Sequence, residues 1–257
     1  MAKTFEALMK AQKENLIRLE EAKVFDIKTN YKPKPKPKPK SSLPVSFKAL
    51  PQIIEEYHRM RQTLLSINAE EKIKALLFSS SSKGEGTSTV LTNFAITLAS
   101  GGDKVLVVDA NHRNPSLHDL LKVEQRNGLT ELLLDKNTLR DVIKETQIKN
   151  LSVITSGIPL SNPFSIFESN LLDNLIVQMK AQSDWVLFDS PPINVYNDPR
   201  TLATKMDGVV MVVQAEKTRW EVAQSARQKI ENGKAKILGV ILNRRKMHIP
   251  EWAYKRL

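Results

Sequence analysis

The sequence predicts an α/β fold, with a mostly parallel sheet and helices on both of its faces. Short apolar segments alternate with longer helix-forming segments from about residue 45 onward, which is the pattern of parallel strands joined by crossover helices. The apolar segments are nearly continuous, as expected of strands that are covered on both faces. A turn rich in serine and glycine joins the first of them to a helix.

The elements are expected at ranges set by the apolar pattern. Helices are predicted at about 53–65, 87–100, 164–182 and 218–231, and strands at about 75–78, 104–109, 151–155, 185–189, 208–213 and 235–242. The apolar run at 208–213 is far shorter than the ~18 residues that would cross a membrane, so we interpret it as a buried strand.

Composition limits the classes of function. The chain has 257 residues, enough for one sizeable α/β domain with appendages, and it has no cysteine, which excludes disulfides, thiol catalysis and cysteine-ligated metals. Its net charge of +11 favours an acidic partner surface such as anionic lipid, nucleic acid or an acidic protein. The first residues contain no apolar stretch, so no secretory signal is expected.

Two segments precede the main domain, which is predicted at 45–257. Residues 1–30 are expected to hold an amphipathic helix that either folds back on the domain or docks on a partner or membrane. Residues 31–44 form a linker in which lysine and proline alternate, and the repeat at 32–40 reaches roughly 28 Å when extended. Its lysines are either solvated or in contact with anionic lipid. The apolar stripe of the helix comprises Phe5, Leu8, Met9, Leu16 and Leu19.

The turn at 79–89 is similar to a phosphate-binding loop, whose pattern is G-x-x-x-x-G-K-[ST]. Gly86 and Ser88 stand at the second glycine and at the hydroxyl, while Ser81 replaces the first glycine and Thr87 replaces the lysine. Backbone N–H groups and the N-terminus of the next helix would still attract phosphate. A plain turn is the alternative. The candidate cofactor ligands in this loop are Lys83, Gly84, Glu85, Gly86, Thr87, Ser88 and Thr89.

Two of the predicted strands end in a carboxylate, Asp109 and Asp189. Ligands of open parallel sheets lie at the carboxyl ends of the strands, so both aspartates should meet the loop there. Ser88, Asp109 and Asp189 therefore predict a Mg²⁺ site beside bound phosphate. The alternative is that each aspartate only caps a turn or a helix.

Together these segments resemble the cytoplasmic domain of the bacterial tyrosine kinases (BY-kinases), a family of capsule and exopolysaccharide synthesis. In the family loop pattern P-G-E-G-K-S, Lys83 stands at the proline and Thr87 at the lysine. In the pattern D-x-D-x-R-x-P, Asp109 and Arg113 are kept, while Asn111 replaces the second aspartate. The segment 189–192 matches the pattern D-[ST]-P-P. The family is grouped with the partition and septum ATPases, and the resemblance implies a P-loop NTPase fold with ATP or ADP and Mg²⁺ as cofactors.

The resemblance also implies roles for residues outside these motifs. Arg113 and Asn243 are expected to contact the nucleotide, Asn243 at the adenine. An oligomerisation motif, E-x-x-R-x-x-R, is expected at Glu55, His58 and Arg61, with His58 in place of the first arginine. The family partner is a membrane-spanning polysaccharide co-polymerase, which implies a cytoplasmic chain, peripheral at the inner face of the cell membrane.

The departures from the family pattern fall on the chemistry. The catalytic positions are Asp109, Asn111 and Asp189, but an asparagine cannot accept a proton at neutral pH as the family's aspartate is expected to do. Thr87 lacks the charge that stabilises the transferring phosphoryl group. Lys83 either compensates for that loss or faces solvent. The single Tyr254 near the end of the chain is not the tyrosine cluster of active members.

Three functions remain open at this stage. The first is a degenerate BY-kinase that binds nucleotide, catalyses weakly or not at all, and acts through oligomerisation and docking to the co-polymerase. The second is an active tyrosine autokinase or ATPase that uses Lys83. The third is a partition- or septum-type ATPase that binds membrane or DNA. Nucleic acid is a minor candidate, because the sequence has no basic patch interleaved with aromatic residues.

Overall fold

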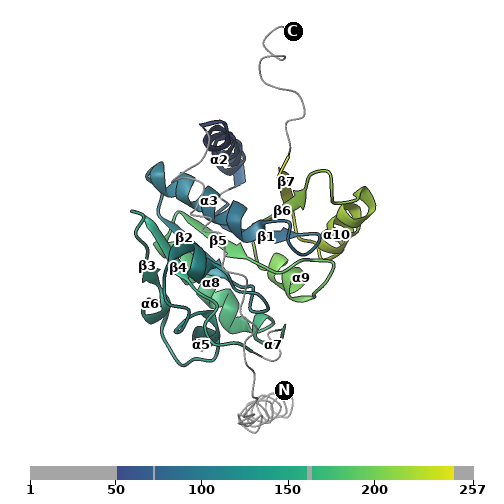
Figure 1. Ribbon diagram of the computed structural model, residues 1–257. Helices are drawn as coiled ribbons and strands as arrows, with labels where there is room; N and C mark the ends of the chain where they lie inside the picture. The colour runs from purple at the N-terminus through teal and green to yellow at the C-terminus, as the bar shows by residue number, and fades with distance from the viewer. Residues whose placement is uncertain (1–50, 72, 161–163, 246–257) are drawn as a thin grey trace, which may run out of the picture. The chain divides into compact units, whose positions relative to one another are not determined.

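The computed structural model describes residues 51–71, 73–160 and 164–245. The predicted helix within residues 1–30, the linker at 31–44 and Tyr254 lie outside this part of the chain. The elements run α2 (Pro51–Glu71), β1 (Ala75–Ser80), α3 (Thr87–Ser100), β2 (Val105–Asp109), α4 (Leu117–Leu121), α5 (Leu129–Leu133), α6 (Leu139–Val142), β3 (Lys144–Glu145), β4 (Leu151–Ile154), α7 (Phe164–Phe167), α8 (Asn170–Gln182), β5 (Trp185–Asp189), α9 (Asp198–Ala203), β6 (Gly208–Gln214), α10 (Trp220–Asn232) and β7 (Ile237–Asn243) (Figure 1).

The strands form a 7-stranded sheet in the order β3-β4-β2-β5-β1-β6-β7. Neighbouring strands pair in parallel, except that β3 is antiparallel to β4. The register sets Asp109 at the end of β2 opposite Asp189 at the end of β5. The fold therefore confirms the predicted mostly parallel sheet, and it places the two carboxylates side by side.

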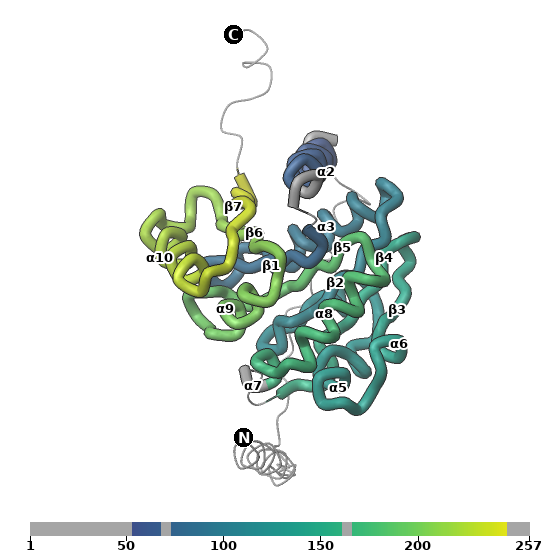
Figure 2. Tube along the Cα trace, turned by 180° about the vertical axis from the view of Figure 1, so that it is seen from behind, coloured from purple at the N-terminus to yellow at the C-terminus, as the bar shows by residue number. Residues whose placement is uncertain are grey.

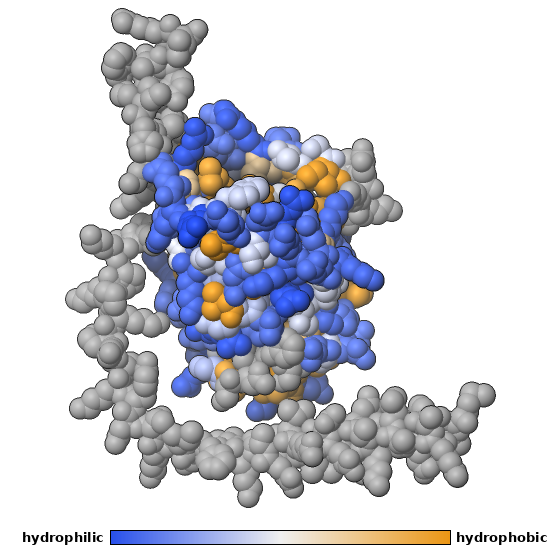
Figure 3. All heavy atoms as spheres, turned by 90° about the vertical axis from the view of Figure 1, so that its right-hand side faces the viewer, coloured by the Kyte–Doolittle hydropathy of each residue, from blue (hydrophilic) through white to orange (hydrophobic). Residues whose placement is uncertain are grey.

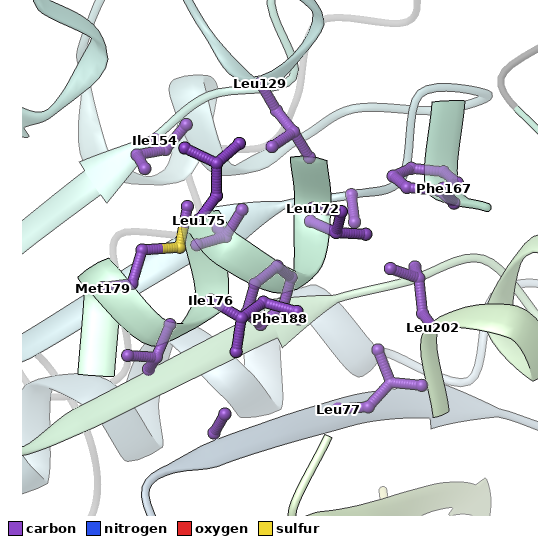
Figure 4. Close-up of a cluster of buried hydrophobic side chains, with 14 of the residues drawn as sticks. Leu77, Leu129, Ile154, Phe167, Leu172, Leu175, Ile176, Met179, Phe188 and Leu202 are labelled. Carbon is purple, nitrogen blue, oxygen red and sulfur yellow. The ribbon is translucent and has the colours of Figure 1, made fainter. Parts of the chain in front are cut away.

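Helices cover both faces of the sheet, as the continuous apolar strands predicted (Figures 1 and 2). Side chains of β1 alternate between two cores, so that Leu77 packs with α8, α9 and α10 while Leu76 packs with α2, α3 and α4. Figure 4 shows the first core, in which Leu172, Leu175 and Ile176 of α8 gather over Phe188 of β5.

Two sequence expectations needed correction. The single helix predicted at 164–182 is wrong, because the structure has α7 and α8 on either side of Ser169. The Ser169 backbone is extended (φ −71°, ψ 144°), and its hydroxyl donates to the carbonyl of Ile166 at 2.8 Å, so the chain starts a new helix there. The short elements α4, α5, α6, β3 and α9 had no predicted counterpart, since elements of two to six residues are too short to show a period.

The surface has no large apolar band on the face shown in Figure 3, where hydrophobic atoms form small separate patches among hydrophilic ones in the coloured, described residues. Across residues 51–71, 73–160 and 164–245, the structure contains no helix with the length and hydropathy needed to cross a membrane.

Candidate functional site

The turn between β1 and α3 has the backbone geometry of an anion-binding loop. Gly84 (φ 82°) and Gly86 (φ 94°) are left-handed, a conformation that favours glycine. A Cβ on Gly86 would lie 2.4 Å from the side-chain nitrogen of Asn243, so this position also has no room for a side chain. α3 begins immediately afterwards, at Thr87, and the unpaired N–H groups of its first turn carry partial positive charge.

Glu85 holds this loop in shape. Its side chain is buried, and its carboxylate accepts hydrogen bonds from the Ser81 hydroxyl at 2.9 and 3.0 Å and from the Ser82 N–H at 2.9 Å. The Thr218 hydroxyl, at the start of the α10 region, also donates to it. Ser81, which replaces a glycine of the general pattern, therefore has a structural role as a donor within the loop.

Asn243, at the end of β7, ties this strand to the same loop. Its side-chain nitrogen donates to the carbonyl of Glu85 at 2.8 Å. The next residue, Arg244, donates from Nη1 to the carbonyl of Gly84 at 3.0 Å and to Gln214 Oε1 at 3.2 Å. The loop is thus connected to the end of β6, the neighbour of β1 in the sheet, and to the end of β7, the strand beyond it.

The two strand-end carboxylates are both fully buried. Asp109 accepts three backbone hydrogen bonds, from the N–H groups of Asn111 at 3.1 Å, Ser116 at 3.0 Å and Leu117 at 3.1 Å. Asp189 Oδ2 accepts the Ser88 hydroxyl at 2.5 Å. Asp189 Oδ1 is buried and has no hydrogen-bond partner among the described residues.

Burial changes the protonation of this pair. Burial raises the pKa of Asp109 to about 6, despite its three backbone N–H donors, which lower it. Burial, and to a smaller extent the charge of Asp109, raises the pKa of Asp189 well above its ordinary value, although the hydrogen bond from the Ser88 hydroxyl lowers it. Two adjacent buried carboxylates disfavour the doubly ionised state, and a cation bound beside them would offset that charge.

The residues fit a Mg²⁺ ion. Asp189 Oδ1, which has no partner among the described residues, and the Ser88 hydroxyl would supply oxygen ligands, and oxygen is the donor that Mg²⁺ prefers. Residues 51–71, 73–160 and 164–245 contain no cluster of three His, Cys, Asp or Glu side chains that would form an all-protein cage. This agrees with Mg²⁺ sites at phosphates, where one or two protein ligands are completed by water and phosphate.

The segment after β2 holds two motif positions, Asn111, where the family residue is replaced, and Arg113, where it is retained. Asn111 donates its backbone N–H to Asp109, and its side-chain oxygen accepts the N–H of Asn114 at 3.2 Å, so Asn111 stabilises the turn. Arg113 donates from Nε and Nη2 to the buried carboxylate of Asp198 at 2.9 and 3.3 Å.

The structure also shows contacts that sequence reasoning missed. The Lys83 side chain is exposed and its nitrogen lies 5.2 Å from the centre of the Tyr196 ring, while the guanidinium carbon of Arg113 lies 4.3 Å from the same centre. Tyr196 and Asp198 follow the 189–192 motif, and Arg244 follows Asn243, so proximity to a motif is the only sequence signal they carry. Thr218 has no such signal.

Among the remaining predicted site residues, Thr87 is buried at the start of α3 and Thr89 is partly exposed in its first turn. The predicted oligomerisation residues lie on α2. Glu55 is exposed and pairs with Arg59 at 2.7 Å, and His58 is exposed. Arg61 pairs within the chain, with Asp103 at 3.1 Å.

Comparison with known proteins is consistent with this geometry. The AAA domain family matches residues 73–237. The tyrosine-protein kinase YwqD of Bacillus subtilis is 34% identical over 193 residues, which cover 75% of this chain and 81% of YwqD. The chain belongs to the bacterial tyrosine kinase family. This is the family of capsule and exopolysaccharide synthesis that the motifs resemble.

Solved structures place the BY-kinase fold among the P-loop ATPases. The chimerical protein CapA2B2 has a TM-score of 0.76 and 31% identity, covering 80% of this chain and 91% of that chain. The septum site-determining protein MinD of Pyrococcus horikoshii, solved with Mg-ADP, has a TM-score of 0.58 and 24% identity, covering 71% and 76%. The MinD likeness shows a shared fold.

Proposed function

We propose that this BY-kinase-family chain binds adenine nucleotide with Mg²⁺ and transfers phosphoryl groups weakly or not at all. One contrast carries the proposal. The groups proposed to bind phosphate and Mg²⁺ are in position, because the loop amides are preorganised and Asp189 Oδ1 has no other partner among the described residues. The transfer groups are replaced, because Thr87 is buried at the start of α3 and the side-chain oxygen of Asn111 accepts a backbone N–H.

In this proposal each residue acts through a group already in position. Backbone N–H groups of residues 84–88 hold phosphate oxygens, and the two left-handed glycines let the backbone approach them. Ser88 and Asp189 hold Mg²⁺, which when bound supplies positive charge to the phosphates and to the buried carboxylates. Asp109 lies beside Asp189 and completes the acidic end of the site.

The replaced groups account for slow transfer. Removing one donor that stabilises the transition state lowers a rate by ~10²–10³, and removing a general base lowers it by ~10²–10⁴. The amide of Asn111 has no basic atom at neutral pH. Thr87 carries no charge, so neither position supports phosphoryl transfer as the family residue would.

We further propose that the chain works at the cytoplasmic face of the cell membrane, by self-association and by docking to a membrane-spanning polysaccharide co-polymerase. The family is the main support for this partner. The exposed side of α2, with Glu55 and His58, is the surface proposed for self-association. The net charge of +11 is compatible with an anionic membrane surface.

A second candidate is an active autokinase or ATPase in which Lys83 supplies the missing charge. The observation that favours it is the position of Lys83, which shares the Tyr196 ring with Arg113. A partition- or septum-type ATPase is less well supported, because the MinD likeness is one of fold alone.

Transfer from γ-labelled ATP in the purified full chain tests the proposal. We expect no measurable autophosphorylation in the wild type, tighter nucleotide binding but little transfer in Thr87→Lys, and transfer in the double variant Thr87→Lys with Asn111→Asp. Robust transfer by the wild type would support the Lys83 kinase. Robust transfer by Thr87→Lys alone would contradict the role given to Asn111. Asn174→Asp, the same change at an exposed position of α8, is the matched control for Asn111→Asp.

A further inference from the structure

Tyr196 brings together two cations from different parts of the chain. Lys83 comes from the loop after β1, Arg113 from the turn after β2, and Tyr196 itself from the segment between β5 and α9. The lysine nitrogen is 5.2 Å and the guanidinium carbon 4.3 Å from the ring centre. Both distances are within the ~6 Å at which a cation is attracted by an aromatic face.

This arrangement needs a physical reason, because two cations on one ring repel each other. The aromatic face offsets part of the repulsion, and Asp198 offsets more by pairing with Arg113 at 2.9 Å. Asp198 is almost fully buried, with 2% of its side chain exposed, so Arg113 is fixed in place. Lys83 is exposed, so its ammonium group, with three N–H donors, is accessible to a ligand.

Donors remain available for an anion. A guanidinium has five N–H groups, and Asp198 accepts from two of the nitrogens, Nε and Nη2, of Arg113. Nη1 takes no part in this ion pair. Two cations with open donors on one platform are suited to a doubly charged oxyanion such as phosphate.

The sheet order fixes which end of a nucleotide would meet this platform. Along β2-β5-β1-β6-β7, the phosphate loop follows the central strand β1, and Asn243 ends β7 on one side of it. Arg113 and Tyr196 follow β2 and β5 on the other side. With adenine at the Asn243 end, as the family resemblance implies, the phosphate chain would run across the loop toward Tyr196. The terminal phosphate is therefore the group nearest to Lys83 and Arg113.

We propose that Lys83 and Arg113, held on the ring of Tyr196, form an anchor for the terminal phosphate of a nucleoside triphosphate. Tyr196 is a positioning residue that acts through the two cations. The anchor places near the γ-phosphate a positive charge that Thr87 cannot supply. This inference rests on the proposed nucleotide binding, and it predicts that the site distinguishes a triphosphate from a diphosphate.

The geometry is tested first without nucleotide. In NMR spectra of the full chain, the ring of Tyr196 should shift the side-chain resonances of Lys83 and Arg113 upfield. The shifts should persist in Tyr196→Phe, which keeps the aromatic face, and disappear in Tyr196→Leu. Equal spectra for the Phe and Leu variants would refute the platform.

Binding is tested by calorimetry with Mg²⁺-ATP, Mg²⁺-ADP and inorganic triphosphate. Tyr196→Leu should weaken ATP and triphosphate binding two- to five-fold and leave ADP binding unchanged, whereas Tyr196→Phe should match the wild type. Equal losses for ATP and ADP, or equal losses in both variants, would overturn the anchor. Lys83→Ala should weaken ATP and triphosphate binding but not ADP binding, and Lys136→Ala, at an exposed lysine between α5 and α6, is its control for loss of charge.

The triphosphate separates the two proposals. If ATP does not bind but inorganic triphosphate binds and is weakened by Tyr196→Leu, the anchor stands and the nucleotide function fails. If neither molecule binds the wild type, the anchor is refuted as well. If ATP and ADP bind with equal response to every variant, the nucleotide function stands and the anchor fails.

Discussion

The buried carboxylate pair predicts that the ligand-free protein becomes less stable as pH rises toward neutrality. Asp109 has its pKa raised from 3.8 to about 6 by burial, so the folded state holds the proton more tightly than the unfolded state. The stability that protonation provides is therefore complete below the unfolded pKa and is lost as pH rises through the folded pKa. The full effect is ~3 kcal/mol, and the part between pH 4.5 and pH 7 is about 2 kcal/mol.

Urea unfolding of the wild type and Asp109→Asn at several pH values measures this effect. Relative to the wild type, the variant should gain about 2 kcal/mol in free energy of unfolding between pH 4.5 and pH 7. His112, whose pKa burial lowers, is present in both proteins and cancels in the difference. Asp189 does not cancel, because the charge of Asp109 raises its pKa; removing that charge lowers the pKa of Asp189 and adds to the gain of the variant. A difference that does not change with pH would refute the reasoning.

Asp207 provides a control of opposite sign. Burial raises the pKa of Asp207, but N–H donors from Ala75 and Lys74 and the ammonium of Lys180 outweigh burial and lower it. Its stabilising contribution is present above the unfolded pKa and is lost as pH falls through the folded pKa. Asp207→Asn should therefore lose stability relative to the wild type as pH rises from acid to neutral, whereas Asp109→Asn should gain.

The remaining predictions concern the loop and α2. Thr218→Val removes a donor to buried Glu85 and should lower the free energy of unfolding by about 1.5–3 kcal/mol in urea titrations; an unchanged midpoint would contradict the role of this bond. Arg244→Gln should weaken Mg²⁺-ADP binding about two- to five-fold in calorimetry, since an exposed charged contact contributes up to ~1 kcal/mol, and unchanged affinity would remove Arg244 from the site. Arg61→Ala should lower both stability and self-association, whereas His58→Ala should lower only self-association; sedimentation like that of the wild type in both variants would count against α2 as the interface.

The fold and the centre of the site were predictable because the signals are local. Apolar strands and the helices between them gave the parallel sheet, and the carboxylates at the strand ends then had to meet at its carboxyl edge. The pairing of Asp109 with Asp189 and the contact of Ser88 with Asp189 follow from that topology. The family resemblance was confirmed by the relatives.

Other contacts could not be predicted, because they join residues that share no motif and no period. Glu85 bonds to Thr218 and Arg244 bonds to Gly84 across 133 and 160 positions of sequence. The meeting of Lys83 and Arg113 on Tyr196 depends on side-chain orientation after three different strands. Asn111 was predictable only in part. The sequence shows that an asparagine replaces the family's aspartate, but not that its side-chain oxygen accepts the Asn114 N–H.

Calorimetric titration of the purified full chain with Mg²⁺-ATP, beside Ser88→Ala, tests the central claim most directly. Ser88 contacts Asp189 at the proposed metal position, so its hydroxyl is needed for Mg²⁺ but not for the loop amides. The account predicts saturable binding of one nucleotide per chain by the wild type, weakened at least ~10-fold in Ser88→Ala, as for loss of a group that orients a bound metal. No binding by the wild type up to millimolar Mg²⁺-ATP would contradict it.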